Sequence, residues 1–280
     1  MSKAPPPPES GLDSAPEATA RPRERRQRVQ AAETGMTVLK GLARLGGRAS
    51  LTALAAHIDE SPAKVHRYLM SLIAEGLVDQ EAATQQYHLG LEALFIGVAA
   101  MRQADPLRIG EPALVRLREN LAVTCFIAVM GNKGPTIVRF EEPGLPVTVN
   151  VRVGSVLSML WSATGRAFLG LLDEAPVQAL AEAELAGAPV EQRALLDRED
   201  PIGALRREVR ALGCATVKDT NLRGISAVSA PLYDHTGRVC AVLTALGATG
   251  GFDVSADGAV VAAVKKEALA ASVALGYVAK

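Results

Sequence analysis

The sequence predicts an α+β protein in which two folded units follow a polar tail. Its length of 280 residues exceeds the roughly 150 of one typical domain, and 49% of the residues are hydrophobic, enough to fill real cores. Up to Glu75, apolar residues recur at three- and four-residue spacing, which is typical of helices, and a short hairpin follows. Beyond residue 105, segments in which apolar and polar residues alternate, as in strands, lie between segments with a helical period. This order indicates an antiparallel sheet with separate helices.

Residues 1–27 form a Pro- and Arg-rich tail, in which we expect disorder. Six prolines fall between Met1 and Pro22, so this segment has little to bury. Five arginines then occupy eight positions, among them Arg25, Arg26 and Arg28. Such an arm suits contact with DNA phosphates, or it simply solubilises the chain, and from the arm alone both interpretations stand equal.

Charge and hydropathy limit the class of protein. The formal net charge is zero, but residues 21–102 carry eleven Lys/Arg against eight Asp/Glu, whereas residues 103–280 carry eighteen against nineteen. No stretch reaches the ~18 apolar residues of a membrane-spanning helix, and the start lacks the apolar segment of a secretory signal. We therefore expect a cytoplasmic protein without membrane contact.

The first folded unit, at residues 28–90, begins with three predicted helices. The first covers residues 29–45 and stops at a pair of glycines, and Ser50 caps the second. Ser61 and Pro62 begin the third helix. This order is favoured because serine caps a free N–H group, while proline has no N–H to satisfy at the first helical position.

The third helix has one apolar and one polar face. Val65, Leu69 and Leu72 share a stripe, which predicts packing against the first two helices. The opposite face gathers small, polar and basic side chains near the helix start, where they can reach bases and phosphates. The predicted DNA contacts on this helix are Ser61, Ala63, Lys64, His66, Arg67 and Ser71.

Two short strands follow, at residues 77–79 and 86–89, joined by a polar turn. They form a wing. Helix, helix, turn, helix and hairpin within about sixty residues describe a winged helix-turn-helix domain, a more specific pattern than a helix-turn-helix alone. This architecture predicts double-stranded DNA as the partner. One recognition helix reads only a few base pairs, so an operator requires two copies at spaced half-sites.

Two stretches of this unit are more specific still. The third helix contains Ser61-Pro62-Ala63-Lys64-Val65-His66-Arg67-Tyr68-Leu69, and Tyr87-His88-Leu89-Gly90 leaves the wing. Both resemble the DNA-binding domain of the IclR family of bacterial transcriptional regulators, in which the His-Arg pair and the Tyr-x-Leu-Gly exit recur. The resemblance implies a linker helix at residues 91–104, a GAF-like effector-binding domain at residues 105–280, and homodimers or homotetramers that respond to a small organic effector.

The expected linker helix carries an apolar stripe. Leu91, Leu94, Phe95 and Val98 fall on one side of it, which predicts a dimer contact. Packing against its own domain would produce the same stripe, so both interpretations remain open.

The second unit has its own sequence of predicted elements. Helices are expected at residues 106–121, 162–172, 176–186, 202–212 and 256–277, and strands at 123–130, 135–141, 147–152, 225–232 and 239–246. From Gly154 to Arg166 the spacing matches a family pattern, as does Ala227 to Asp234. Val217 and Thr220 occupy two positions at which the family carries acids, which would lower repulsion toward an anionic effector.

A candidate pocket lies where the 162–172 helix begins. Free N–H groups at a helix start bind carboxylates, Met159 and Trp161 can form an apolar wall, and strand hydroxyls can add polar contacts. Ordinary capping by Ser162 and a core tryptophan are the alternative. The predicted effector contacts are Met159, Trp161, Ser162, Ala163, Thr164, Gly165, Ser226, Ser229 and Thr244. The resemblance points to small carboxylates or aromatic acids as effectors.

Catalytic motifs are missing from the sequence. It contains no phosphate-binding loop, nucleophile elbow, zinc-protease motif or dinucleotide fingerprint. Cys125, Cys214 and Cys240 fit neither a metal clip nor a disulfide set. We therefore predict no catalytic residues, no metal, no cofactor and no enzyme activity. The alternative is a thiol redox sensor or enzyme with an N-terminal partner-binding helical module, in which Lys218 would activate Cys214.

Overall fold

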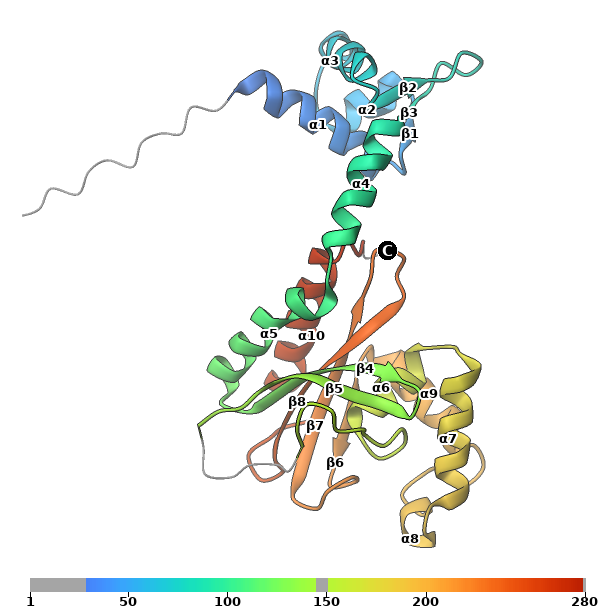
Figure 1. The fold of residues 1–280 in the computed structure, drawn as a ribbon, viewed down its shortest axis with the longest axis vertical. Helices are drawn as coiled ribbons and strands as arrows, with labels where there is room; N and C mark the ends of the chain where they lie inside the picture. The colour runs from blue at the N-terminus through green and yellow to red at the C-terminus, as the bar shows by residue number, and fades with distance from the viewer. Residues whose placement is uncertain (1–28, 145–150, 279–280) are drawn as a thin grey trace, which may run out of the picture. The chain divides into compact units, whose positions relative to one another are not determined.

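The computed structural model describes residues 29–144 and 151–278 (Figure 1). The tail predicted at residues 1–27 lies outside these ranges. The chain divides into two compact units, Met1–Val98 and Ala99–Lys280, and the division falls inside the predicted linker segment.

The first unit combines three helices with a small antiparallel sheet. Its helices are α1 (Gln30–Arg44), α2 (Leu51–His57) and α3 (Pro62–Ala74), and its strands are β1 (Arg48–Ala49), β2 (Val78–Gln80) and β3 (Tyr87–Leu89) in the order β1-β3-β2. The winged helix-turn-helix is thus confirmed. The sequence missed β1 because two residues are too short to show alternation.

Local sequence explains how these helices start and pack. The hydroxyl oxygens of Ser50 and Ser61 each accept a hydrogen bond from the backbone N–H three residues on, at 3.2 and 3.4 Å. Each such cap stabilises its helix by about 1 kcal/mol. The predicted apolar stripe of α3 is buried, with Val65 and Leu69 in the core that α1 and α2 complete.

The second unit is built on a five-stranded antiparallel sheet in the order β5-β4-β8-β7-β6. Its strands are β4 (Thr124–Gly131), β5 (Gly134–Glu141), β6 (Ala215–Lys218), β7 (Ile225–Tyr233) and β8 (Val239–Ala248). Its helices are α5 (Pro106–Leu121), α6 (Ala163–Leu171), α7 (Ala175–Gly187), α8 (Val190–Arg193), α9 (Pro201–Leu212) and α10 (Ala259–Ala274). Before them, α4 (Leu91–Gln103) continues out of the first unit.

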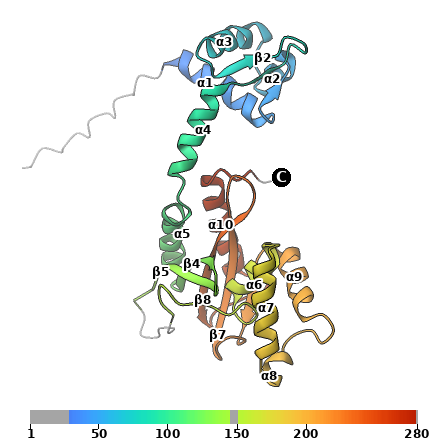
Figure 2. The same ribbon diagram turned by 45° about the vertical axis from the view of Figure 1, so that its right-hand side comes forward.

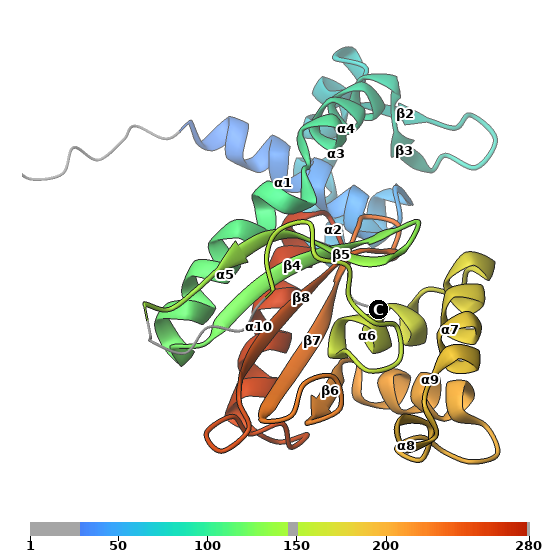
Figure 3. The ribbon, with the colours of Figure 1, turned by 60° about the horizontal axis from the view of Figure 1, so that its bottom comes forward.

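Helices cover both faces of this sheet, and each face has its own core. Alternation along β4 sends Phe126 and Ala128 to one face and Cys125 and Ile127 to the other. The first face packs on α6, with α7 and α9 outside it (Figure 3). The second packs on α5 and α10, which lie side by side (Figure 2).

The secondary structure differs from expectation at three places. Of the strand expected at residues 147–152, positions 147–150 lie outside the described residues, and Val151 and Arg152 belong to no strand. The strand β6 was not predicted because four residues between a helix and a loop give a weak alternation signal. The one-turn helix α8 is likewise too short to show a helical period.

Candidate functional site

The predicted DNA-contact residues of α3 share one outward face. Ser61, Ala63, His66, Arg67 and Ser71 are exposed. Lys64 is half-buried on the same first turns. Ala63, Lys64, Arg67 and Ser71 lie on the side of α3 opposite its buried stripe, whereas Ser61 is the N-cap and His66 lies at the flank.

Polar contacts on this face leave one cation without a partner. Arg67 makes no hydrogen bond or ion pair through its side chain with any described residue, whereas Lys64 Nζ lies 2.6 Å from Glu60 Oε1. His66 Nδ1 lies 3.2 Å from the hydroxyl of Tyr87, which ties α3 to β3 of the wing. Arg67 is thus the cation of this face whose charge no described carboxylate neutralises.

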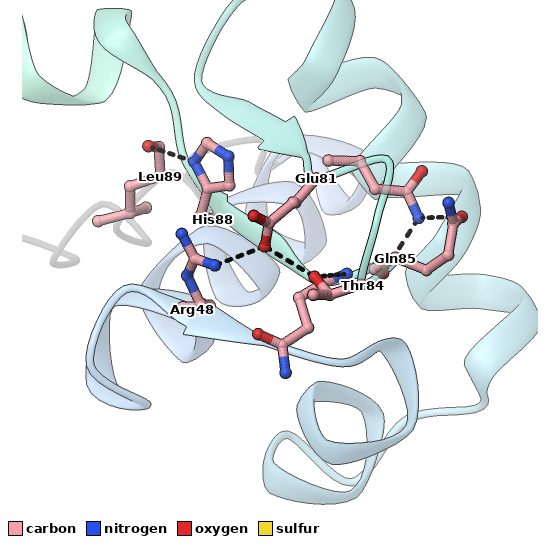
Figure 4. Close-up of polar contacts among 8 residues, drawn as sticks. Arg48, Glu81, Thr84, Gln85, His88 and Leu89 are labelled. Atoms are coloured by element: carbon pink, nitrogen blue, oxygen red, sulfur yellow. Dashed lines mark hydrogen bonds and ion pairs between the residues drawn. The ribbon is translucent and has the colours of Figure 1, made fainter.

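The wing depends on a network around Glu81 (Figure 4). Arg48 Nη1 lies 2.6 Å from Glu81 Oε2, and the Thr84 hydroxyl donates to the same oxygen at 2.7 Å. The Thr84 hydrogen bond and then the Arg48 charge hold the pKa of Glu81 below its usual range. Residues 77–89 contain no lysine or arginine, so the wing itself offers no cation to phosphate.

The charge of the winged unit is low for a DNA-binding domain. Residues 29–90 contain five Lys/Arg against six Asp/Glu, a net charge of −1. Positive charge gathers instead in residues 21–28, with five arginines against one glutamate. The predicted contacts Arg25, Arg26 and Arg28 belong to that segment and lie outside the described residues.

A pocket opens in the second unit where α6 begins. Residues of α6, of the segment before it, of four strands and of the loop after β6 line it, namely Phe126, Val151, Leu157, Ser162, Ala163, Thr164, Val217, Asn221, Leu222, Ile225, Ala227, Thr244 and Leu246. None of them carries a charge. The cavity volume is about 40 Å³, and a water needs about 10–15 Å³ by the same measure. It therefore holds only a few non-hydrogen atoms unless its walls move.

Two polar groups face this pocket. The first two N–H groups of an α-helix have no acceptor within the helix, and those of Ala163 and Thr164, two residues that line the pocket, donate to no acceptor among the described residues. The second group is a cluster of buried hydroxyls: Thr244 lies 2.9 Å from Thr164 and 2.7 Å from Ser229. Thr164 also lies 3.4 Å from Ser229, so the three hydroxyls contact one another, and each can turn to donate or to accept.

The turn before α6 is fixed by a carboxylate from α7. The backbone N–H of Met159 donates to Glu184 at 2.7 Å, and the hydroxyl of Ser158 donates to the same carboxylate. Gly165 packs so closely on this turn that an added Cβ would lie 2.0 Å from the Ser158 carbonyl oxygen. The first turn of α6 is therefore held in place at the pocket wall.

The predicted effector residues divide into two groups. Ser162, Ala163, Thr164 and Thr244 line the pocket. The other five do not: Met159 and Trp161 are core residues, Gly165 faces the preceding turn, Ser226 contacts Thr249, and Ser229 lies behind Thr244. The apolar wall expected from Trp161 comes instead from Phe126, Leu157 and Leu222. No local sequence pattern marks these three residues, because strand pairing and the course of the loops place them at the pocket.

Val217 and Thr220 stand at the two positions where the resemblance to the family implied acids, and neither adds a charge to the pocket. Val217 lines it, and the Thr220 hydroxyl donates to the Trp161 carbonyl at 2.7 Å. Asp219, which lies between them, accepts from the Gly224 N–H at 2.7 Å and does not line the pocket. This carboxylate thus organises the loop and does not replace the missing acids.

The three cysteines are poorly suited to redox chemistry. Burial raises the pKa of the Cys125 thiol to about 12 and that of Cys240 to about 11. Burial also raises the pKa of Cys214, although the charge of Lys265 opposes the shift. Among the described residues, no cluster of His, Cys, Asp or Glu could hold a metal ion, and no helix is long and apolar enough to cross a membrane.

Comparison with known proteins identifies both units. The family model of the IclR helix-turn-helix domain matches residues 31–82, and that of the bacterial transcriptional regulator IclR C-terminal domain matches residues 98–273. The chain belongs to the IclR family. It is a transcriptional regulator with an N-terminal helix-turn-helix and a C-terminal effector-binding domain, and the alternative of a redox sensor or enzyme is not favoured.

Individual IclR relatives extend over most of the chain. The crystal structure of Pseudomonas aeruginosa HmgR is 40% identical, covers 89% of this chain and 99% of its own, and gives a TM-score of 0.82. The HTH-type transcriptional repressor AllR of Klebsiella pneumoniae is 25% identical over 228 residues, 78% of this chain and 80% of the relative. The repressor BlcR of Agobacterium tumefaciens, 16% identical with a TM-score of 0.73, shows the same fold.

Proposed function

We propose that this IclR-family chain acts in the cytoplasm as a homodimer or homotetramer that binds operator DNA through α3 and responds to a small carboxylate in the pocket at α6. The observation that carries the DNA half is the exposed face of α3, on which the Arg67 side chain has no partner in the part of the chain that the structure describes. A recognition helix enters the major groove with its first turns, where an arginine can donate two hydrogen bonds to guanine.

The arginine arm supplies most of the phosphate attraction in this proposal. A winged unit with a net charge of −1 between residues 29 and 90 attracts duplex DNA weakly by itself. The five arginines of residues 21–28 compensate for this. Affinity for any duplex should therefore fall steeply with salt.

The dimer contact in this proposal is α4. Leu91, Leu94 and Phe95 of the predicted apolar stripe are each more than half exposed, Val98 is half-buried, and no residue of α4 is buried. This exposure favours the dimer interpretation of the stripe. An exposed apolar surface of this kind marks a protein contact, and a second copy places two α3 helices on one operator.

The effector in this proposal is a small carboxylate. The N–H groups of Ala163 and Thr164 and the turnable hydroxyl of Thr164 offer donors to an anion in a pocket that contains no carboxylate. A cavity of about 40 Å³ favours a small acid, and a larger aromatic acid requires the loop that carries Leu222 to move.

Two experiments test these parts separately. Operator sequences are selected from a random duplex pool, and their affinity for the protein is measured by fluorescence anisotropy; we expect selected duplexes to bind far more tightly than random ones. A thermal-shift screen then compares small carboxylates with their amides. A true effector raises the unfolding temperature by mass action and changes operator affinity. Amides that match the carboxylates would contradict the anion site.

A further inference from the structure

Cations are scarce on the DNA-binding unit, and two of them are held by carboxylates. The five between residues 29 and 90 are Lys40, Arg44, Arg48, Lys64 and Arg67. Of these, Arg48 lies beside the wing and Lys64 on the first turn of α3, and both form ion pairs within the unit. DNA must open those pairs before it can use either charge.

The pair on α3 lies at the start of the recognition helix. Lys64 and Glu60 are four residues apart, with Nζ and Oε1 at 2.6 Å and side chains 34% and 32% exposed. Both groups remain accessible to water and ions. A phosphate therefore competes with the Glu60 carboxylate for the same ammonium group.

The pair at the wing is fixed by a further hydrogen bond. Arg48 Nη1 lies 2.6 Å from Glu81, and Thr84 holds the same carboxylate oxygen from across the turn (Figure 4). The carboxylate is therefore oriented toward Arg48 before DNA arrives. In addition, the backbone N–H of Glu81 donates to the Gln86 carbonyl at 2.9 Å, which keeps the wing turn closed.

We propose that Glu60 and Glu81 are specificity-determining residues, which withhold Lys64 and Arg48 from non-operator duplex and release them on an operator. This proposal rests on the DNA-binding function proposed above. Non-specific binding depends on phosphate contacts alone, so it gains little when an ion pair within the protein must open first. On an operator, base contacts fix the position of α3 and the wing, so each released cation meets a well-placed partner.

The test uses the full-length protein and two isosteric variants, Glu60→Gln and Glu81→Gln. Glutamine still accepts the Thr84 hydrogen bond but no longer holds the cation by charge. The matched control is Glu75→Gln, because Glu75 is exposed in the same unit and pairs with no cation among the described residues. Anisotropy gives the affinities for a random duplex and for a selected operator across a salt series.

We expect Glu60→Gln and Glu81→Gln to raise affinity for the random duplex by up to about fivefold each, since this is the factor by which opening an exposed ion pair weakens binding. Affinity for the operator should change less, so the specificity ratio falls. The dependence of log affinity on log salt should steepen by about one for the random duplex with each variant. Glu75→Gln should leave the salt slope unchanged.

A double variant separates release of a cation from a general change of charge. In an Arg48→Gln background, Glu81→Gln should have no more effect on random-duplex affinity than Glu75→Gln. If the Glu81→Gln effect persists there, or if both test variants shift random and operator affinity equally, the proposal is wrong. If the unaltered protein binds no duplex at low salt, the proposed function itself fails.

Discussion

The hydroxyl oxygens of Thr164 and Thr244 lie 2.9 Å apart, where the first turn of α6 meets β8. Both residues line the uncharged pocket, and the Ser229 hydroxyl behind them contacts both, at 2.7 Å from Thr244 and 3.4 Å from Thr164. Because each hydroxyl can turn, the chain can present a donor to an anion at Thr164. A contact between residues 80 positions apart thus sets the polar character of the pocket.

Replacing Thr244 with valine should weaken effector binding. Valine keeps the shape but removes one of the three hydroxyls, so Thr164 loses its 2.9 Å partner and keeps only the 3.4 Å contact with Ser229, which fixes its direction less well. We expect the dissociation constant of a carboxylate found by the thermal-shift screen to rise roughly three- to tenfold. Thr216→Val is the control, because Thr216 lies on β6 outside the pocket lining. Equal affinities in both variants would exclude a role for the hydroxyl chain.

Replacing Gly165 with alanine should destabilise the second unit. The added Cβ would lie 2.0 Å from the Ser158 carbonyl oxygen and 2.5 Å from the Met159 Cα, and backbone atoms cannot turn away. We expect a loss of ~1–3 kcal/mol, measured by denaturant unfolding. Gly187→Ala at the end of α7, where a Cβ meets nothing within 4 Å, should be neutral by comparison. Equal stability of the two variants would show that the turn adapts.

The raised pKa values of the cysteines predict how stability varies with pH. An unfolded thiol ionises near its ordinary pKa of 9.0, whereas Cys125 keeps its proton in the folded state up to about 12. Above pH 9 the unfolded state therefore binds fewer protons, and the free energy of unfolding falls as pH rises toward 12. Cys125→Ser should flatten this dependence. Near neutral pH we expect the thiols of the folded protein to react slowly with an alkylating agent. Treatment with peroxide should leave duplex binding unchanged. Rapid alkylation of the folded protein would instead support the alternative of a redox sensor.

Removing the arginine arm should reduce the salt dependence of duplex binding. Replacing Arg25, Arg26 and Arg28 with alanine deletes three cations, and each phosphate contact contributes about 0.9 to the slope of log affinity against log salt. We expect the slope to fall by about two to three. Deleting residues 1–20, which carry no arginine, should leave the slope intact. An unchanged slope in the alanine variant would support the solubilising interpretation of the arm.

Features determined by neighbours in the chain were predictable from sequence. Ser50 and Ser61 cap their helices as predicted, and Ser162 caps α6 as the alternative interpretation of that residue expected, because a cap depends only on residues within one turn. The buried stripe of α3 followed from its period in the same way. By contrast, β1 pairs with β3 over two residues, a contact that no local pattern records.

The pocket was only partly predictable because sheet pairing assembles it. The prediction placed Ser162, Ala163 and Thr164 correctly at the start of α6, since a helix start is a local feature. Trp161 is buried in the core and does not line the pocket. The sequence could not predict this, because it does not reveal which way the turn before α6 faces. The meeting of Ser229 with Thr244 depends on the register of β7 against β8.

Arg67 is the side chain through which the whole regulator function is most directly tested. Arg67→Ala should lose most of its affinity for a selected operator in an anisotropy titration, by about 5- to 150-fold, since a well-placed arginine contact to a base is worth ~1–3 kcal/mol. Arg198→Ala, an exposed arginine of the second unit, is the control and should bind as tightly as the unaltered protein. Operator affinity that is equal in Arg67→Ala and Arg198→Ala would contradict DNA recognition by α3.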